Sequence, residues 1–283
     1  MRGGSLKPSP GQLCIATWNI EGLTEPKLAT LETYMHEYGI HMLCLQEVRR
    51  LLSDYYVTDN GFLLITSGGQ QAPEYAGVGF LVHPVLRQHI CNFCQHSSRV
   101  AGIKIRTPGG KIAVVTAYAP HANRPFEERF HFFQNLTTYW RSISVNGQKL
   151  CFGDLNSRLY CRFGGEEQFI GKHFFENQEK CMVDTMNRYL LLEFCSTTNN
   201  CLANTFFEHP LRKLVTFRAP GTQPFDTITR TNFAQLDLVL TDTKWMHQVL
   251  DIQSCVEMPL PTQHFVLWCA LNVCIGKQQI THK

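Results

Sequence analysis

Hydrophobic residues make up 44% of this 283-residue chain and charged residues 17%, with a formal net charge of +3 at pH 7. This composition excludes an intrinsically disordered protein, because there are enough apolar residues for a sizeable core. The weak net charge excludes nucleic-acid binding through overall charge alone, but it leaves open a local basic strip that follows phosphates.

The first half of the chain is expected to mix strands with one helix. In chain order we expect a strand over 13–20, a helix over 26–39, a strand over 40–48, a strand pair over 61–68 and 75–84, and a hairpin over 99–120. The helix is predicted by apolar residues at helical spacing that end at Gly39. The hairpin is predicted to turn at the Thr-Pro-Gly-Gly stretch, 107–110.

The second half continues the same mixture. We expect a helix over 126–143, a strand over 149–156, a helix over 182–195, and strands over 214–219, 235–242 and 265–273. Hairpins and helices alternate unevenly, which predicts an α+β sandwich with helices outside packed sheets. No linker or repeat interrupts the middle. We therefore expect a flexible lead-in over 1–11, one domain over 12–276 and a polar tail over 277–283.

The amino-acid sequence shows no targeting signal and no set of paired cysteines. The N-terminal segment has no apolar stretch typical of a signal peptide, and the longest apolar run, 265–275, is too short to span a bilayer. The twelve cysteines are scattered, several inside apolar runs, as is typical of reduced thiols in a core. The one CxxC pair, Cys91 and Cys94, has no second pair, so we do not expect a zinc site. These features predict an intracellular protein, nuclear or cytoplasmic, with no membrane partner.

Polar side chains recur where the predicted strands end. They are Asn19, Glu47, Tyr118, Asp154 and Asn156, joined by Asp237 inside an apolar run and His264 just before the last strand. Taken singly, each has a structural explanation; Asp154 and Asn156, for example, are common turn residues. A buried carboxylate at Asp237 is harder to explain, because it is costly without a partner. If the strand ends converge, all these groups share one rim.

Phosphodiester hydrolysis needs the groups found in this set. A divalent cation neutralises charge on the phosphate, and Mg²⁺ prefers one or two carboxylates, a role that Glu47 fits. Asp154 with Asn156 can orient and activate the attacking water. Tyr118 and His264 can stabilise the charge that develops on the phosphate, and a buried carboxylate such as Asp237 can orient the imidazole.

Six segments, in this order along the chain, resemble the motifs of one superfamily. They are ATWNIEGL, LCLQEV, VVTAYAP, FGDLNSRL, QLDLVL and TQHFVL. The chain thereby resembles, over about residues 12–275, the endonuclease/exonuclease/phosphatase superfamily, which includes DNase I, exonuclease III-like apurinic endonucleases and inositol polyphosphate 5-phosphatases. The segments YAGVGFLV and LLLEFCSTTNNCLANTFFEHPLRKLVTFRAP are among those similar to the endonuclease domains of RTE/BovB-type non-LTR retrotransposons and to craniofacial development protein 2-like proteins.

The resemblance implies a fold, a cofactor and roles. The fold is a DNase I-like four-layer α/β sandwich, with two mixed β-sheets face to face and helices outside. The cofactor is Mg²⁺, with Mn²⁺ as a substitute. The implied roles are metal binding by Glu47 with Asn19 beside it, contact of Tyr118 with the scissile phosphate, water activation or leaving-group assistance by Asp154, phosphate positioning by Asn156, and an orienting dyad of Asp237 and His264.

One departure from the family pattern falls in the site. The family usually has Ser-Asp-His where this chain has Thr262, Gln263 and His264. The replaced aspartate is commonly a metal-side ligand. Gln263 keeps a neutral oxygen there and removes one negative charge, so we expect weaker Mg²⁺ affinity with activity retained. Glu21 is a candidate for a second carboxylate near the metal.

The resemblance predicts a monomeric endonuclease that nicks DNA and leaves a 3′-hydroxyl, with RNA as an alternative substrate. Two other functions remain open. One is an inositol-phosphate or lipid phosphatase of the same fold. The other is a catalytically weakened remnant that binds nucleic acid without turnover. Metal-dependent nicking that depends on Asp154 separates the first function from the last.

Overall fold

The computed structural model describes residues 11–50, 52–68, 76–175 and 186–275. Its strands are β1 (Leu13–Asn19), β2 (Met42–Gln46), β3 (Tyr55–Val57), β4 (Leu63–Ser67), β5 (Val78–Val82), β6 (Ile90–Gln95), β7 (Val100–Thr107), β8 (Gly110–Tyr118), β9 (Lys149–Asp154), β10 (Asn200–Leu202), β11 (Phe217–Arg218), β12 (Phe233–Ala234), β13 (Asp237–Asp242), β14 (Val249–Cys255) and β15 (Val266–Leu271). Its α-helices are α1 (Glu25–Tyr38), α2 (Pro84–Arg87), α3 (Phe126–Ser142) and α4 (Met186–Thr198).

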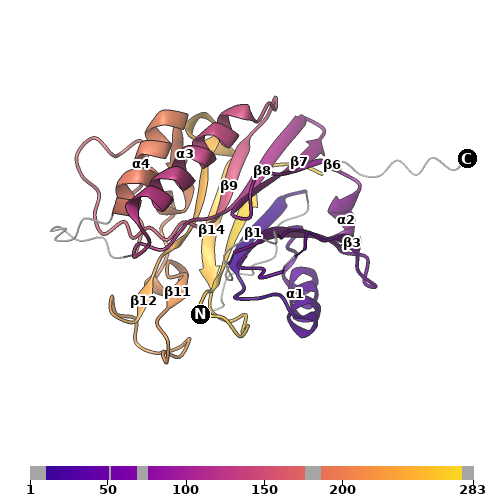
Figure 1. The fold of residues 1–283 in the computed structure, drawn as a ribbon, viewed down its shortest axis with the longest axis horizontal. Coiled ribbons are helices and arrows are strands. Elements are labelled where there is room, and N and C mark those ends of the chain that lie inside the picture. The colour runs from indigo at the N-terminus through magenta and orange to yellow at the C-terminus, as the bar shows by residue number, and fades with distance from the viewer. Residues whose placement is uncertain (1–10, 51, 69–75, 176–185, 276–283) are drawn as a thin grey trace, which may run out of the picture.

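The strands form two large mixed sheets and one small ribbon. The first sheet has seven strands in the order β14-β15-β1-β2-β5-β4-β3, and the second has six in the order β10-β13-β9-β8-β7-β6. Each large sheet contains one parallel pair, β1 with β2 and β8 with β9, and its other pairs are antiparallel. The ribbon pairs β11 with β12 and lies at the lower left of Figure 1.

Three apolar clusters separate four layers. One cluster lies between the two sheets and takes alternate residues of each strand, such as Leu13 and Ile15 of β1 and Phe152 of β9. The other face of the seven-stranded sheet packs against α1, and the other face of the six-stranded sheet packs against α3 and α4. Figure 1 shows α3 and α4 together outside one sheet and α1 outside the other. The predicted four-layer sandwich is confirmed.

Local sequence explains where α1 begins and ends. The Thr24 side chain accepts a hydrogen bond from the backbone N–H of Lys27, and Pro26 occupies the first turn. Gly39 ends the helix in the left-handed conformation, with φ of 68°. The helix start places the Lys27 ammonium group on the carbonyl oxygens of Ile20 and Glu21, just beyond β1.

Several expectations about elements need correction. The predicted strand over 214–219 shrinks to the two residues of β11, and the helix predicted to end at 195 continues to Thr198. Residues 182–185 of that predicted helix lie outside the described residues, as do 1–10 and the polar tail. The strands β3, β6, β10, β12 and β14 and the short helix α2 were not predicted. β3 and β6 are edge strands with exposed or half-buried residues, so their sequences lack a strong apolar run.

The cysteines behave as predicted within the described segments. Eleven are present there, all as free thiols, and eight of them are buried. Cys91 and Cys94 lie on β6, where Cys91 donates a hydrogen bond to the Lys104 carbonyl oxygen. Among the described helices, none has the length and apolar character needed to cross a membrane.

Candidate active site

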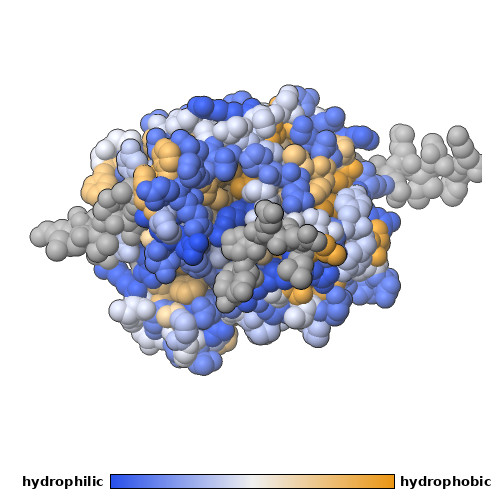
Figure 2. Space-filling view, viewed as in Figure 1, coloured by the Kyte–Doolittle hydropathy of each residue, from blue (hydrophilic) through white to orange (hydrophobic). Residues whose placement is uncertain are grey.

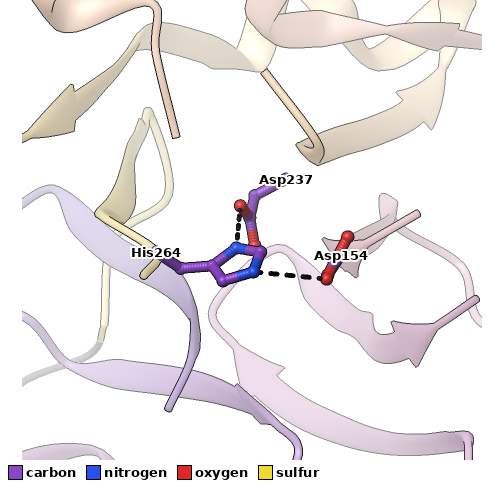
Figure 3. A group of neighbouring side chains, drawn as sticks. All are labelled: Asp154, Asp237 and His264. Atoms are coloured by element: carbon purple, nitrogen blue, oxygen red, sulfur yellow. Dashed lines mark hydrogen bonds and ion pairs between the residues drawn. The ribbon is translucent and has the colours of Figure 1, made fainter. Parts of the chain in front are cut away.

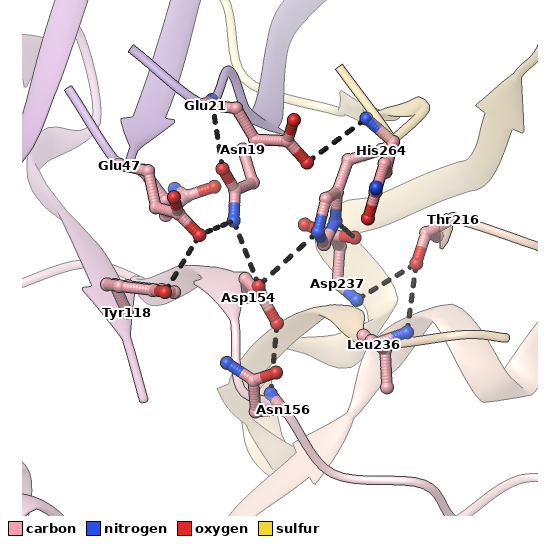
Figure 4. A network of polar contacts seen from close by, with 12 residues as sticks. Asn19, Glu21, Glu47, Tyr118, Asp154, Asn156, Thr216, Leu236, Asp237 and His264 are labelled. Carbon is pink, nitrogen blue, oxygen red and sulfur yellow. Dashed lines mark hydrogen bonds and ion pairs between the residues drawn. The ribbon is translucent and has the colours of Figure 1, made fainter. Parts of the chain in front are cut away.

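The strand registers bring the predicted polar residues to one end of the sandwich. Asp154, the last residue of β9, lies directly opposite Tyr118 on β8 and Asp237 on β13. Because β13 runs antiparallel to β9, the residue opposite the last residue of β9 is the first residue of β13. Asp237 therefore begins its strand, which corrects the expectation that it lies inside an apolar strand. All three side chains follow the alternation that faces the other sheet, so the buried apolar surface between the sheets becomes polar at this rim (Figure 4).

Asn19 links two carboxylates across the rim. It is fully buried at the end of β1, and its amide nitrogen donates to Glu47 Oε1 at 3.0 Å and to Asp154 Oδ2 at 3.1 Å. Its amide oxygen accepts the backbone N–H of Glu21 at 3.2 Å. The amide therefore holds one carboxylate from each sheet at hydrogen-bond distance from a single nitrogen.

Glu47 is held ionised despite its burial. Burial raises the pKa of its carboxyl group, but hydrogen bonds from Asn19, Arg49 and Tyr118 outweigh it and leave that pKa below the ordinary value. The Tyr118 hydroxyl donates to Oε1 at 2.8 Å, and the Arg49 guanidinium donates to Oε2 through Nη2 at 2.5 Å. Burial, with the charges of Glu47 and Asp154, raises the pKa of Tyr118, so the phenol stays protonated as a donor.

A buried triad lies beside this pair (Figure 3). His264 Nδ1 is 2.8 Å from Asp237 Oδ2, and His264 Nε2 is 3.7 Å from Asp154 Oδ2. Thr216 accepts hydrogen bonds from the backbone N–H groups of Leu236 and Asp237, which fixes the start of β13. The imidazole ring therefore lies between two carboxylates from adjacent strands.

The electrostatics of the triad favour a protonated imidazole. Burial lowers the pKa of His264, but the charges of Asp237 and Asp154 more than compensate and raise it to about 9. Burial raises the pKa of Asp154 to about 7, although the nearby imidazolium opposes this shift. A carboxylate with a pKa near neutrality can accept a proton from water and release it again at physiological pH.

We expect Asp237→Asn to lower the His264 pKa from about 9 toward or below its ordinary 6.5. The substitution removes the largest charge that holds the proton on the ring. Because the folded-state pKa exceeds the unfolded one, ring protonation stabilises the fold fully below pH 6.5, and this contribution, up to about 3 kcal/mol, disappears as the pH rises through 9. Nitrogen chemical shifts of the imidazole across this range measure the pKa directly. An unchanged pKa in the variant would contradict the assignment.

Left-handed backbone is concentrated in this site. Glu21, Glu47, Arg49 and Asn156 all have positive φ, between 46° and 55°. Such conformations are unfavourable for residues with a Cβ and persist where surrounding contacts enforce them. For Asn156, the backbone N–H donates to Asp154 Oδ1 at 3.0 Å and the side chain donates to the Ala119 carbonyl oxygen at 2.8 Å. The predicted Asp154–Asn156 pair is thus one rigid turn.

Other site residues were not identified from the sequence. Arg49 pairs with Glu47, and His121 Nε2 lies 3.2 Å from the Tyr118 hydroxyl oxygen. Thr262 donates its hydroxyl to the Asn19 carbonyl oxygen at 2.8 Å. Arg49 stands two positions after Glu47, and His121 stands three positions after Tyr118. Closeness in sequence to these predicted site residues was the feature that could have identified them. Gln263 joins the site through its backbone N–H, which donates to Glu21 Oε1 at 3.2 Å.

The donor set suits a hard divalent cation. Asp154, Asp237 and His264 offer ligand atoms within 4.8 Å of one another, but both ring nitrogens of His264 already face carboxylates. The carboxylates of Glu47 and Asp154 meet at Asn19 and supply oxygen ligands of the kind that Mg²⁺ and Mn²⁺ prefer. The residues present therefore fit Mg²⁺ beside Glu47.

Comparisons with known proteins agree with this fold. Residues 16–256 match the model of the Endonuclease/Exonuclease/phosphatase family. Craniofacial development protein 2 from Bos taurus is 22% identical over 240 residues, covering 84% of this chain and 37% of that protein, so the chain spans little more than a third of this relative. The AP endonuclease LMAP from Leishmania major has a similar fold, with a TM-score of 0.68, 15% identity, and coverage of 92% of this chain and 88% of that one.

The endonuclease domain of TRAS1, a telomere-specific non-LTR retrotransposon, is also similar, with a TM-score of 0.58, 10% identity, and coverage of 92% and 98% of the two chains. These likenesses confirm the resemblance that the sequence motifs indicated. Because the family match extends over most of the chain, the protein belongs to the Endonuclease/Exonuclease/phosphatase family.

Proposed function

We propose that the protein is a Mg²⁺-dependent phosphodiesterase, an endonuclease that nicks DNA and also works with Mn²⁺. One observation carries the proposal. Asn19 holds the Glu47 and Asp154 carboxylates together, directly beside a buried His264 that two carboxylates keep protonated. Oxygen ligands, a proton acceptor near neutrality and a fixed cation are the groups that phosphodiester hydrolysis requires.

Each residue has a defined part in the proposed reaction. A cation bound at Glu47 supplies charge neutralisation at the phosphate. Asp154 accepts a proton as the water oxygen bonds to phosphorus. Asn156 donates to the phosphate the amide hydrogen that Ala119 does not accept, and Tyr118 donates to it by turning its hydroxyl hydrogen away from Glu47. The bond from phosphorus to O3′ breaks, and O3′ takes up a proton from a solvent water to become the 3′-hydroxyl, leaving a 5′-phosphate. The proton held by Asp154 then returns to solvent. Protonated His264, oriented by Asp237, stabilises the negative charge that develops on the phosphoryl oxygens.

Basic groups around the carboxylates favour a polyanionic substrate. Arg99 places its guanidinium over the Tyr118 ring, 4.9 Å from the ring centre, and Arg218 donates to the Thr262 carbonyl oxygen at 3.1 Å. With Arg49 and Lys27, these side chains border the site on several sides. Cations of this kind can contact the phosphates of a nucleic-acid strand. Similarity to an AP endonuclease and to a retrotransposon endonuclease domain supports DNA as this strand.

The face shown in Figure 2 also fits a soluble, charged substrate. Hydrophilic residues predominate on it, and the hydrophobic residues are scattered in small groups. A surface that takes a lipid substrate usually presents a continuous apolar patch. We therefore favour nucleic acid over a lipid headgroup. We also propose that the protein acts as a monomer.

A plasmid-nicking assay tests the proposal. Purified protein is incubated with supercoiled DNA at increasing Mg²⁺ or Mn²⁺ and, separately, with EDTA. We expect conversion to nicked circles only with free cation, and ends that DNA polymerase extends without phosphatase treatment, which identifies a 3′-hydroxyl. Release of inorganic phosphate from inositol polyphosphates without nicking would favour a phosphatase. Binding of DNA with no cleavage at any cation concentration would favour a catalytically silent remnant.

A further inference from the structure

A buried asparagine of the helix layer reaches the turns at the active-site rim. Asn187 is the second residue of α4 and is fully buried. Its amide nitrogen donates to the Asn156 carbonyl oxygen at 2.9 Å and to the Pro120 carbonyl oxygen at 3.0 Å. Its amide oxygen accepts a hydrogen bond from Arg129 Nη1, on α3, at 3.3 Å. One side chain therefore joins both outer helices to the turns that follow β8 and β9.

The partners of Asn187 admit only one orientation of its amide group. The two carbonyl oxygens can only accept hydrogen bonds, and the guanidinium group can only donate them. Both amide hydrogens and the amide oxygen are therefore in use, at a buried position where an unpaired polar group is costly. An aspartate at this position would lack the two donors, and a leucine would lack all three hydrogen bonds.

The two turns held by Asn187 carry groups assigned to the phosphate. The turn after β9 contains Asn156, whose φ is 46° and whose backbone N–H donates to Asp154 Oδ1 at 3.0 Å. The turn after β8 contains His121, whose Nε2 lies 3.2 Å from the Tyr118 hydroxyl oxygen. A left-handed conformation persists where contacts enforce it, and the hydrogen bond to the Asn156 carbonyl oxygen is one such contact.

Hydrogen bonds also join the two turns to each other. The Ala119 N–H donates to the Asp154 carbonyl oxygen at 2.9 Å, and the Asn156 amide nitrogen donates to the Ala119 carbonyl oxygen at 2.8 Å. The second of these bonds orients the Asn156 side chain, while Asn187 holds the Asn156 backbone. Together they set the direction of the Asn156 amide hydrogen that remains for the phosphate.

We propose that Asn187 is a positioning residue, which holds the Pro120 and Asn156 carbonyl oxygens so that Asp154 and the remaining amide hydrogen of Asn156 meet the same phosphate. The inference rests on the proposed function for the reaction, and it adds a residue that touches neither substrate nor cation. The competing explanation is that Asn187 only fastens α4 to the six-stranded sheet.

Two substitutions of Asn187 test the proposal. Asn187→Leu removes all three hydrogen bonds, whereas Asn187→Asp keeps the oxygen that accepts from Arg129 and removes both donors. We expect each to lower kcat for nicking about 10²-fold, with KM and Mn²⁺ affinity within about threefold of wild type. We also expect the Asn156 backbone N–H to exchange with solvent about tenfold faster in both variants, by NMR. Wild-type kcat and exchange in Asn187→Asp, with losses only in Asn187→Leu, would overturn the proposal.

Asn200→Leu is the matched control. Asn200 is also fully buried, lies beyond the other end of α4, about 20 Å away along the helix axis, and donates its amide to Thr198 Oγ1 at 2.6 Å. We expect this variant to lose a similar free energy of unfolding, because it also removes hydrogen bonds of a buried amide. Its kcat and its Asn156 exchange rate should stay within about twofold of wild type. Equal losses of kcat in Asn187→Leu and Asn200→Leu would favour the fastening role.

The positioning role and the endonuclease activity fail separately. Wild type that cuts no DNA, with Asn156 exchange that still depends on Asn187, refutes the endonuclease and leaves the hold on the turn. Wild type that cuts DNA, with kcat unchanged by Asn187→Leu, refutes the positioning role alone, whether or not the exchange rate rises.

Discussion

Asp154→Asn is expected to lower kcat for metal-dependent nicking by about 10³-fold or more, measured at saturating Mg²⁺. The amide cannot accept a proton from water. Its NH₂ group would also face the donating amide nitrogen of Asn19 and the Nε2 side of His264, where the carboxylate now accepts. The substitution removes one of the carboxylate charges that hold the proton on His264, so the ring should also lose its positive charge at a lower pH.

A charge-matched control separates chemistry from general electrostatics. Asp59→Asn makes the same change at an exposed position in the turn after β3, and we expect kcat within about twofold of wild type. The unfolding midpoint of both variants establishes that the fold persists. Nicking by Asp154→Asn at the wild-type rate would show that this carboxylate does not activate the water, and would leave the proton acceptor to another group at the rim.

Gly153→Ala is expected to lower the free energy of unfolding by about 3 kcal/mol or more. Gly153 precedes Asp154 on β9, which has β8 on one side and β13 on the other. A Cβ atom at this position would lie 1.9 Å from the Ala117 carbonyl oxygen and 3.0 Å from the Ala117 nitrogen. Because the obstructing atoms belong to the backbone of β8, no side-chain rotation relieves the collision, and the two parallel strands must separate.

Gly109→Ala provides the comparison. Gly109 lies in the turn between β7 and β8, and a Cβ atom added there meets no atom within 4 Å. We expect its free energy of unfolding to change by less than about 0.5 kcal/mol. Denaturant titration of the two variants gives the difference. Equal free energies of unfolding would mean that β8 and β9 accommodate the methyl group. Steric exclusion of a side chain would then not explain the glycine at position 153.

The sequence alone determined the composition of each layer. Continuous apolar runs in strands such as β1 and β9 predict strands that are buried on both faces. Polar residues close these runs, so the amino-acid pattern predicts that Asn19, Tyr118 and Asp154 share one rim if the strand ends converge, and the strand pairing meets that condition. The edge strands β3 and β6 escaped prediction because their exposed or half-buried residues form no continuous apolar run.

Only the tertiary structure decided which of these groups touch. The antiparallel pairing of β13 with β9 places Asp237 beside Asp154, and a shift by one residue would turn Asp237 toward α3 and α4. The pairing of Arg49 with Glu47 and the contact of Glu21 with Gln263 depend on left-handed turns at strand ends. Glu21 and Gln263 are 242 positions apart. Local periodicity carries no information about such contacts, because they arise from the register and packing of whole sheets.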